Sequence, residues 1–185
     1  ELAYKSKLKI PILIGIDAIH GNALYEGATV YPSPITIAST WDETNSYIVG
    51  VQTAFEMRST GSHWAFTPNI DVMRDPRWGR VGETFGEDPY LVSQMGVAMI
   101  NGLQQDDFTG LNKVIACAKH LIAGSDPING LNLSDCHFHN FGVLLGASAT
   151  EHRVVIIVAG SRGFHLGEPL NNSEVNTVNA CYRAA

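Results

Sequence analysis

The sequence predicts an α/β fold in which parallel strands form a sheet and helices cover its outer side. Strand-like apolar runs alternate with helix-like segments between residues 10 and 118, in the order strand, helix, strand, helix, strand. Strands joined in this way run parallel through right-handed crossovers. Polar residues follow each of the three strands, namely Asp17, Arg80 and the pair Lys119 and His120. Because the carboxyl ends of parallel strands lie at one edge of a sheet, we expect these four side chains to meet there.

The first strand is expected at residues 10–16, an almost continuous apolar run that contains Pro11. Such a run is typical of a strand buried on both faces of a parallel sheet. Residues 18–34 follow it as a loop with several Gly and Pro residues, which is long for a connection between a strand and a helix. We expect a loop of this length to be functional, and its His20 and Tyr25 could line a pocket.

A helix is predicted next, with Thr40 or Asp42 as its N-cap and its end near Gly61. Its apolar residues recur at helical spacing, at Tyr47, Ile48, Val51, Ala54, Phe55 and Met57. The second strand is expected at residues 64–72, because apolar residues alternate there with polar ones.

The loop after the second strand is dense in charged residues, at Arg74, Asp75, Arg77, Arg80, Glu83 and Glu87. An ordinary turn needs only Gly, Pro, Asn or Asp, so this loop is the first place to look for a binding site. We expect Arg80 to face a ligand and the other five to form an ion-pair network that holds the loop. A second helix is predicted from its N-cap Asp88 through Pro89 to Gly102 or Gln104, followed by a third strand at residues 114–118.

Composition and charge exclude several classes of function. The chain has 185 residues, of which 45% are hydrophobic and 16% charged, which is typical of a globular protein with a core. Its formal net charge is −6 and it has no basic run, so we expect no nucleic-acid partner. No stretch is long and apolar enough to span a bilayer, so no membrane partner is expected. The three cysteines have no CxxC spacing and the histidines no metal-ligand pattern, so neither a metal nor another cofactor is expected.

Three long motifs carry a resemblance to a known family. GIDAIHGN stands at residues 15–22, RDPRWGRVGETFGEDPYLV at 74–92 and AKHLIAGSDPING at 118–130. In this order they resemble the family 3 glycoside hydrolases, the group of β-glucosidases and related exo-glycosidases. The resemblance implies the N-terminal catalytic domain of that family, a TIM-type (β/α)8 barrel. The barrel is expected to be partial here, because a complete one typically needs about 250 residues.

The resemblance also divides the chain. Residues 1–135 are expected to form the partial barrel domain, and residues 136–185 a tail that lacks the family's motifs. In the tail, the β-branched run at residues 153–159 predicts one strand, and the rest predicts irregular or helical segments. The remainder of the barrel and a second domain are then the implied partners of this chain.

The four residues at the strand ends are the candidate sugar-binding residues. A carboxylate such as Asp17 can accept hydrogen bonds from two neighbouring hydroxyls of a sugar ring. The resemblance implies that Asp17 binds the non-reducing terminal sugar and that Arg80 reaches the same sugar, where its planar guanidinium could also pair with Asp17. Lys119 and His120 resemble the family's Lys-His pair, which directs two donors at sugar hydroxyls. The plainer alternatives are a loop-capping Asp17 and a surface Lys-His dipeptide.

Three functions stay open on the sequence. The favoured one is a β-glucosidase-type glycoside hydrolase that acts on a carbohydrate substrate at non-reducing ends by a retaining mechanism, which needs a nucleophilic and a protonating carboxylate. The family's Ser-Asp-Trp nucleophile motif does not occur in the chain, so no catalytic residue is assigned and the chain alone is expected to be inactive. The alternatives are a non-catalytic sugar-binding remnant and an unrelated phosphate-binding α/β enzyme, which the lack of a Gly-rich phosphate loop disfavours. The resemblance implies an extracellular or periplasmic rather than a cytoplasmic location.

Overall fold

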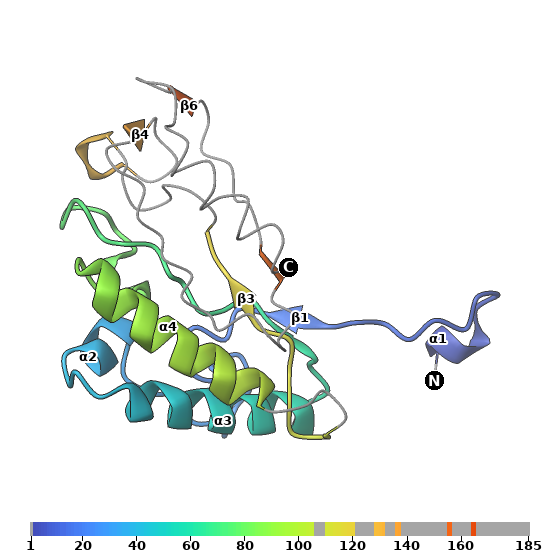
Figure 1. The fold of residues 1–185 in the computed structure, drawn as a ribbon. Coiled ribbons are helices and arrows are strands. Elements are labelled where there is room, and N and C mark those ends of the chain that lie inside the picture. Colours follow the sequence, from blue (N-terminus) through green and yellow to red (C-terminus); the bar gives the residue numbers. More distant parts are fainter. Residues whose placement is uncertain are drawn as a thin grey trace, which may run out of the picture.

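Short parallel strands and two long helices form the body of the protein. The computed structural model describes residues 2–105, 110–120, 128–131, 136–137, 155–156 and 164–165. In Figure 1, helices α3 and α4 pack against each other on one side of the strands, and the N-terminal residues extend away from the body as an arm. The fold is α/β with parallel strands, as the alternation of elements predicts.

The first two strands are parallel neighbours. β1 (Gly15–Ile16) pairs with β2 (Trp64–Ala65), with Gly15 opposite Trp64. The second strand was expected to run through residues 64–72, but its regular pairing stops after Ala65 and resumes as a bridge at Asn69. Pro68 lies in this gap, and proline has no N–H to contribute to a ladder of hydrogen bonds.

The third strand completes the predicted parallel arrangement. Trp64 forms a parallel bridge with Ile115, and Asn69 forms one with Lys119 at the end of β3 (Cys117–Ala118). β3 also pairs in parallel with β5 (Val155–Ile156), which lies inside the strand predicted at residues 153–159. The expectation of three parallel strands side by side is therefore confirmed.

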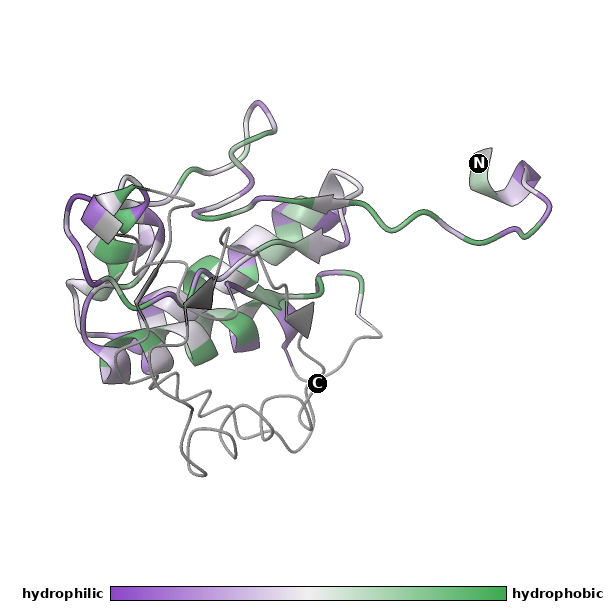
Figure 2. Ribbon diagram, turned by 90° about the horizontal axis from the view of Figure 1, so that it is seen from above, coloured by the Kyte–Doolittle hydropathy of each residue, from purple (hydrophilic) through white to green (hydrophobic). Residues whose placement is uncertain are grey.

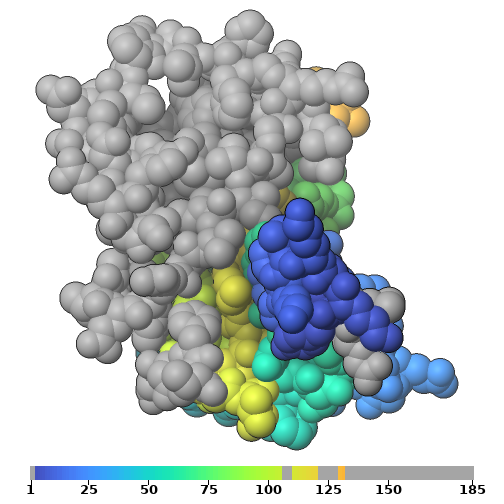
Figure 3. Space-filling model, turned by 90° about the vertical axis from the view of Figure 1, so that its right-hand side faces the viewer, coloured from blue at the N-terminus to red at the C-terminus, as the bar shows by residue number. Residues whose placement is uncertain are grey.

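The N-terminal arm departs from the sequence prediction. It carries α1 (Leu2–Lys5) near its tip and joins the body at the carbonyl of Ile14, which accepts hydrogen bonds from the amides of His63 and Trp64. Ile10 and Ile12 are 64% and 67% exposed, so the expected burial of residues 10–16 on both faces is wrong before β1. In the described part of the chain, no strand pairs with the arm to cover these side chains. Figure 2 shows the arm as an extended, largely hydrophobic segment, and Figure 3, which faces it, shows its blue atoms in front of the body.

Both long helices begin where the sequence predicts. α3 (Glu43–Ser59) has Asp42 as its N-cap, whose carboxylate accepts a hydrogen bond from the Thr44 amide at 2.9 Å. α4 (Pro89–Gln104) has Asp88 as its N-cap, which accepts from the Leu91 amide at 2.8 Å. An N-cap carboxylate accepts hydrogen bonds from amides that have no partner inside the helix. Because these amides are only two or three residues away, both helix starts could be predicted from the local sequence.

The buried face of α3 consists mostly of small residues, with Val49 and Met57 as its larger members. A Cβ atom at Gly50 would lie 2.6 Å from the carbonyl oxygen of Met99 and 3.0 Å from the Cα of Gly102, so the backbones of α3 and α4 are in direct contact there. Ser46 donates a buried hydrogen bond to the carbonyl of Met95 at 2.8 Å. Tyr47, Ile48 and Phe55 stay exposed on the other side of α3.

The core lies between the helices and the strands. Its buried residues include Ala54, Met57, Ala65, Phe85, Met95, Met99, Leu103, Val114 and Ala116. The remaining elements are short: α2 (Pro34–Ala38), the 3-10 helices η1 (Val81–Glu83) and η2 (Ile128–Gly130), and the strand pair β4 (Cys136–His137) and β6 (Phe164–His165). The boundary at residue 135 stays a prediction, because most of the chain around it lies outside the described residues.

Candidate functional site

An ion pair between two strand ends forms one half of the candidate site. Asp17 directly follows β1 and Lys119 directly follows β3, and Nζ of Lys119 lies 2.7 Å from Oδ1 of Asp17. The Lys119 side chain is 8% exposed, whereas that of Asp17 is 57% exposed. The carboxylate therefore offsets a nearly buried ammonium and still has an oxygen open to a ligand.

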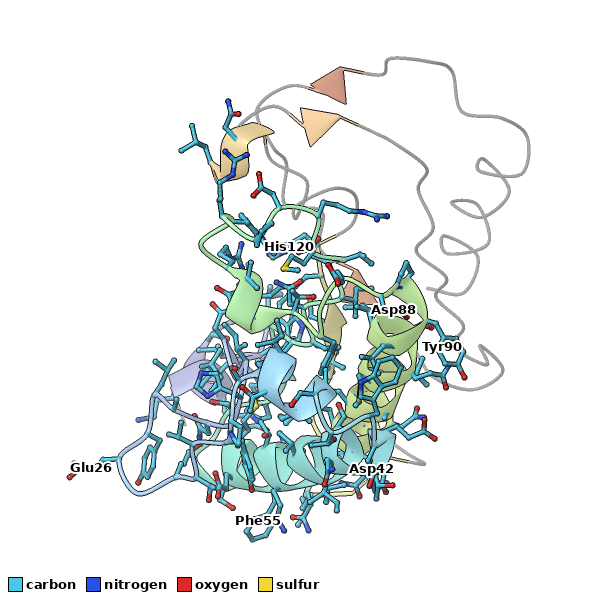
Figure 4. The ribbon with its side chains drawn as sticks, turned by 90° about the vertical axis from the view of Figure 1, so that its left-hand side faces the viewer. Glu26, Asp42, Phe55, Asp88, Tyr90 and His120 are labelled. Atoms are coloured by element: carbon cyan, nitrogen blue, oxygen red, sulfur yellow. The ribbon has the colours of Figure 1, made fainter. Side chains whose placement is uncertain are left out.

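A carboxylate and an imidazole form the other half. Oδ2 of Asp71 lies 2.7 Å from Nδ1 of His120, and the two side chains are 2% and 8% exposed. The backbone of Asp71 is fixed as well, because its amide donates to Oδ1 of Asn69 at 2.9 Å and its carbonyl accepts from the hydroxyl of Thr84. His120 lies away from the outer helix α3, where Phe55 is labelled (Figure 4).

Arg80 connects the charged loop to this pair. It precedes η1, and its NH2 lies 3.4 Å from Nε2 of His120. Its guanidinium binds the carboxylate of Glu83 through two nitrogens, at 2.7 to 3.1 Å, and lies 6.0 Å from the ring centre of the buried Trp78. The hydrogen bonds that Arg80 donates to Glu83 are the main reason why the pKa of Arg80 is raised above its ordinary value. Arg80 is therefore a permanent cation.

The partner expected for Arg80 was wrong. The sequence suggested that its guanidinium could pair with Asp17, but Glu83 takes its hydrogen bonds, and Lys119 is the partner of Asp17. The predicted ion-pair network of the loop is likewise two local pairs in the described residues, Arg80 with Glu83 and the exposed Arg77 with Asp75 at 2.6 Å. Residues two or three apart in a turn reach each other more easily than residues on different strands.

The loop after Asp17, at residues 18–34, contacts helix α3. Glu56 of α3 accepts hydrogen bonds from the amide and the hydroxyl of Thr29 at 2.9 and 2.7 Å, which ties the loop to that helix. Its tip at Glu26 projects from the side opposite His120 in Figure 4. Tyr25 is 58% exposed, and whether it lines a pocket stays a prediction. His20 is half-buried, and its buried Nδ1 has no hydrogen-bond partner among the residues that the structure describes.

The structure thus brings the four predicted residues together at one edge of the sheet. Within a few ångströms they present ammonium, guanidinium, imidazole and carboxylate groups, which can donate to and accept from the hydroxyls of a polar neutral ligand. In the described ranges, no three His, Cys, Asp or Glu side chains are arranged to hold a metal ion. Whether the four residues bind sugar stays a prediction.

Asp71 is the residue of this site that the sequence analysis missed. It falls inside the predicted strand 64–72, where a single acidic residue does not stand out from its neighbours. The available signal was its place at the carboxyl end of that strand, the same place that singled out Asp17 and Lys119.

Comparisons with known proteins show which family the chain belongs to. A model of the glycosyl hydrolase family 3 N-terminal domain matches residues 1–138. A β-xylosidase from Formosa agariphila is 43% identical over 134 residues, which are 68% of this chain and 18% of that protein. A periplasmic β-glucosidase from Salmonella typhimurium is 34% identical over 140 residues, which are 73% of this chain and 18% of that protein. The chain belongs to glycosyl hydrolase family 3.

Solved structures match over the same part of the chain. The β-glucosidase of Listeria innocua in complex with glucose aligns with a TM-score of 0.67 at 36% identity, covering 72% of this chain and 18% of that one. The chain thus spans less than a fifth of the length of the relatives named here. In the described part of the chain, no helix has the length and the apolar character needed to cross a membrane.

Proposed function

We propose that this chain supplies the sugar-binding edge of a β-glucosidase or β-xylosidase that releases sugars from non-reducing ends. The observation that carries the proposal is the contact of Asp17 with Lys119 at 2.7 Å, beside Arg80 and His120, at the edge where parallel strands end. Relatives named for both activities share this part of the chain. The reaction expected of the longer protein is retaining hydrolysis with two carboxylates about 5 Å apart. The periplasmic relative favours a location outside the cytoplasm.

Each residue has a distinct part in the proposed site. The outward oxygen of Asp17 accepts hydrogen bonds from sugar hydroxyls, while Lys119 holds the carboxylate in place and offers its remaining N–H groups. Arg80 approaches from the charged loop with Glu83 fixing its plane. A sugar with the wrong stereochemistry would leave the remaining N–H groups of the nearly buried Lys119 without an acceptor, which is how such a site discriminates.

Binding of gluconolactone or glucose, followed by calorimetry or ligand-observed NMR, tests the sugar site. Asp17→Ala is expected to abolish binding, because it removes the acceptor and leaves the nearly buried ammonium of Lys119 without its counter-ion. Asp75→Ala is the matched control, since it removes a carboxylate of the charged loop that pairs with the exposed Arg77 rather than with a residue of the candidate site, and it should leave the affinity within about twofold. Equal binding by wild type and Asp17→Ala would disprove the sugar-site assignment.

We further propose that the 185-residue chain alone does not hydrolyse glycosides. The family's nucleophile motif is absent from its sequence, and the acidic residues of its tail, Asp135, Glu151, Glu168 and Glu174, lie outside the described residues. A chromogenic β-glucoside should show no turnover with the purified chain above a blank without protein. Turnover that disappears when one of these four carboxylates is replaced by its amide would contradict the proposal and identify the nucleophile. The alternative of a non-catalytic sugar-binding remnant predicts the same binding, but inactivity also when this chain is part of its complete protein.

A further inference from the structure

Asp71 orients the imidazole of the candidate site from behind. Its carboxylate is almost completely buried and lies 2.7 Å from Nδ1 of His120. Its main-chain amide and carbonyl are both held, by Asn69 and by Thr84. A carboxylate fixed in this way cannot follow a rotation of the ring, so the ring has one favourable orientation. Nδ1 then points into the protein and Nε2 points toward Arg80.

The atoms around Nε2 indicate where the imidazole proton lies. Among the described residues, Nε2 of His120 has a polar partner in Nη2 of Arg80, at 3.4 Å. A guanidinium has only donors, so a hydrogen bond across this distance requires Nε2 to be the acceptor. A neutral imidazole carries one proton, which must then be on Nδ1, where the carboxylate of Asp71 accepts it. A proton on Nε2 would instead set two donors against each other beside a permanent cation.

We propose that Asp71 is a positioning residue that holds the ring proton of His120 on Nδ1, while the neighbouring cation of Arg80 disfavours a proton on Nε2, so that Nε2 acts as a hydrogen-bond acceptor for the ligand. The inference rests on the sugar-binding function proposed above and refines it. The sequence resemblance suggested a histidine that donates to sugar hydroxyls, whereas the contacts make His120 an acceptor.

This arrangement selects the chemistry of the group that binds between Arg80 and His120. Because the two nitrogens are 3.4 Å apart, one oxygen atom can lie about 2.8 Å from both. A sugar hydroxyl can accept from Arg80 and donate to Nε2 at the same time. An ammonium group would be repelled by Arg80, and a fluorine or ether oxygen has no proton for Nε2. The site is therefore suited to a neutral hydroxyl.

Nitrogen-15 NMR of the histidine rings in the complete 185-residue chain tests the proposal without any ligand. Protonated and unprotonated ring nitrogens have well separated signals, and those of His120 are the ones lost in His120→Gln. The expected result is a protonated Nδ1 and an unprotonated Nε2. A ring protonated on Nε2, or on both nitrogens, would overturn the proposal. This result does not depend on sugar binding, so it separates a failure of this inference from a failure of the proposed function.

Asp71→Asn gives the second arm of the test, with Asp75→Asn as its matched control. The amide in place of Asp71 can donate to Nδ1 and leave the proton on Nε2, the effect known for an Asp-to-Asn change beside a catalytic histidine. We expect the proton to move to Nε2 and gluconolactone binding to weaken about tenfold or more. Asp75→Asn should change neither. An unchanged proton position, or a shifted proton with unchanged affinity, would overturn the role of Asp71. If Asp71→Asn does not fold, the proton position in the wild type decides alone.

Discussion

Asp17 and Asp75 are both paired carboxylates, yet the two pairs do different work. Asp17 faces the nearly buried Lys119, so its ion pair offsets a charge that water reaches poorly. Asp75 pairs with Arg77, whose side chain is 66% exposed, and water and salt screen that pair. The first pair lies in the candidate site, and the second holds a turn.

The pair of Arg77 and Asp75 leads to a prediction about the pKa of Asp75. Arg77 donates to Asp75 from its side chain and its backbone, and these hydrogen bonds hold the pKa of Asp75 below its ordinary value of 3.8. Because the folded pKa is the lower one, the contribution to stability is present above the unfolded pKa and is lost as the pH falls through the folded pKa. Arg77→Ala should raise the pKa of Asp75 toward 3.8, measured by carboxyl carbon NMR during a pH titration.

Arg58→Ala is the control for this titration. Its side chain donates to the carbonyl of Leu111, not to the charged loop, so the pKa of Asp75 should stay where it is in the wild type. About 1 M salt should also move the wild-type pKa of Asp75 upward, because both partners are at the surface. A pKa that is the same in wild type and Arg77→Ala would show that the backbone hydrogen bond alone lowers it.

At the scale of elements, the sequence predicted the features that depend on neighbouring residues in the chain. It missed the contacts that depend on how folded segments approach each other. Asp42 and Asp88 predicted both helix starts, because an N-cap acts on amides two or three residues away. The four site residues were also predicted, because each follows a strand. The partner of Arg80 was not, since that choice depends on side-chain reach within a folded loop. The apolar pattern found Ala54 and Met57 on the buried face of α3, but it missed Ser46, Gly50 and Thr53, which carry no apolar signal.

Because α3 and α4 are in close contact at Gly50, a methyl group added there should strongly lower the stability of the protein. Gly50→Ala would bring a Cβ atom to 2.6 Å from the carbonyl oxygen of Met99, so the helices must move apart. We expect the free energy of unfolding to fall by about 1–3 kcal/mol, measured by urea denaturation. Gly82→Ala is the matched control, because no atom lies within 4 Å of its added Cβ, and its effect should stay within about 0.5 kcal/mol. Similar losses in both variants would mean that the helix contact is not the cause.

At the scale of the whole molecule, the packed body contrasts with the exposed N-terminal arm. The helices bury a continuous core against the strands. The arm before β1 exposes Leu8, Ile10, Ile12, Leu13 and Ile14 as one apolar stretch. Exposed stretches of this kind beside an open strand edge promote contact with other chains.

The exposed arm predicts association that depends on concentration. The double change Ile10→Lys and Ile12→Lys should reduce the proportion of oligomers seen by sedimentation velocity, because each lysine adds charge to the apolar stretch. Leu111→Lys is the control, since it removes a leucine that is 78% exposed but lies outside the arm. A chain that stays monomeric at all concentrations, or that responds equally to both changes, would contradict a role of the arm.

The contact between Asp17 and Lys119 joins residues 102 positions apart. An unfolded chain rarely brings them together, so a ligand that needs both can bind only the native state. Mass action then couples ligand occupancy to the folding equilibrium: a free ligand concentration of about one hundred times Kd adds about 2.7 kcal/mol to the free energy of unfolding. A melting temperature that rises with sugar concentration would therefore report on the intact site in a chain that turns over no substrate at all.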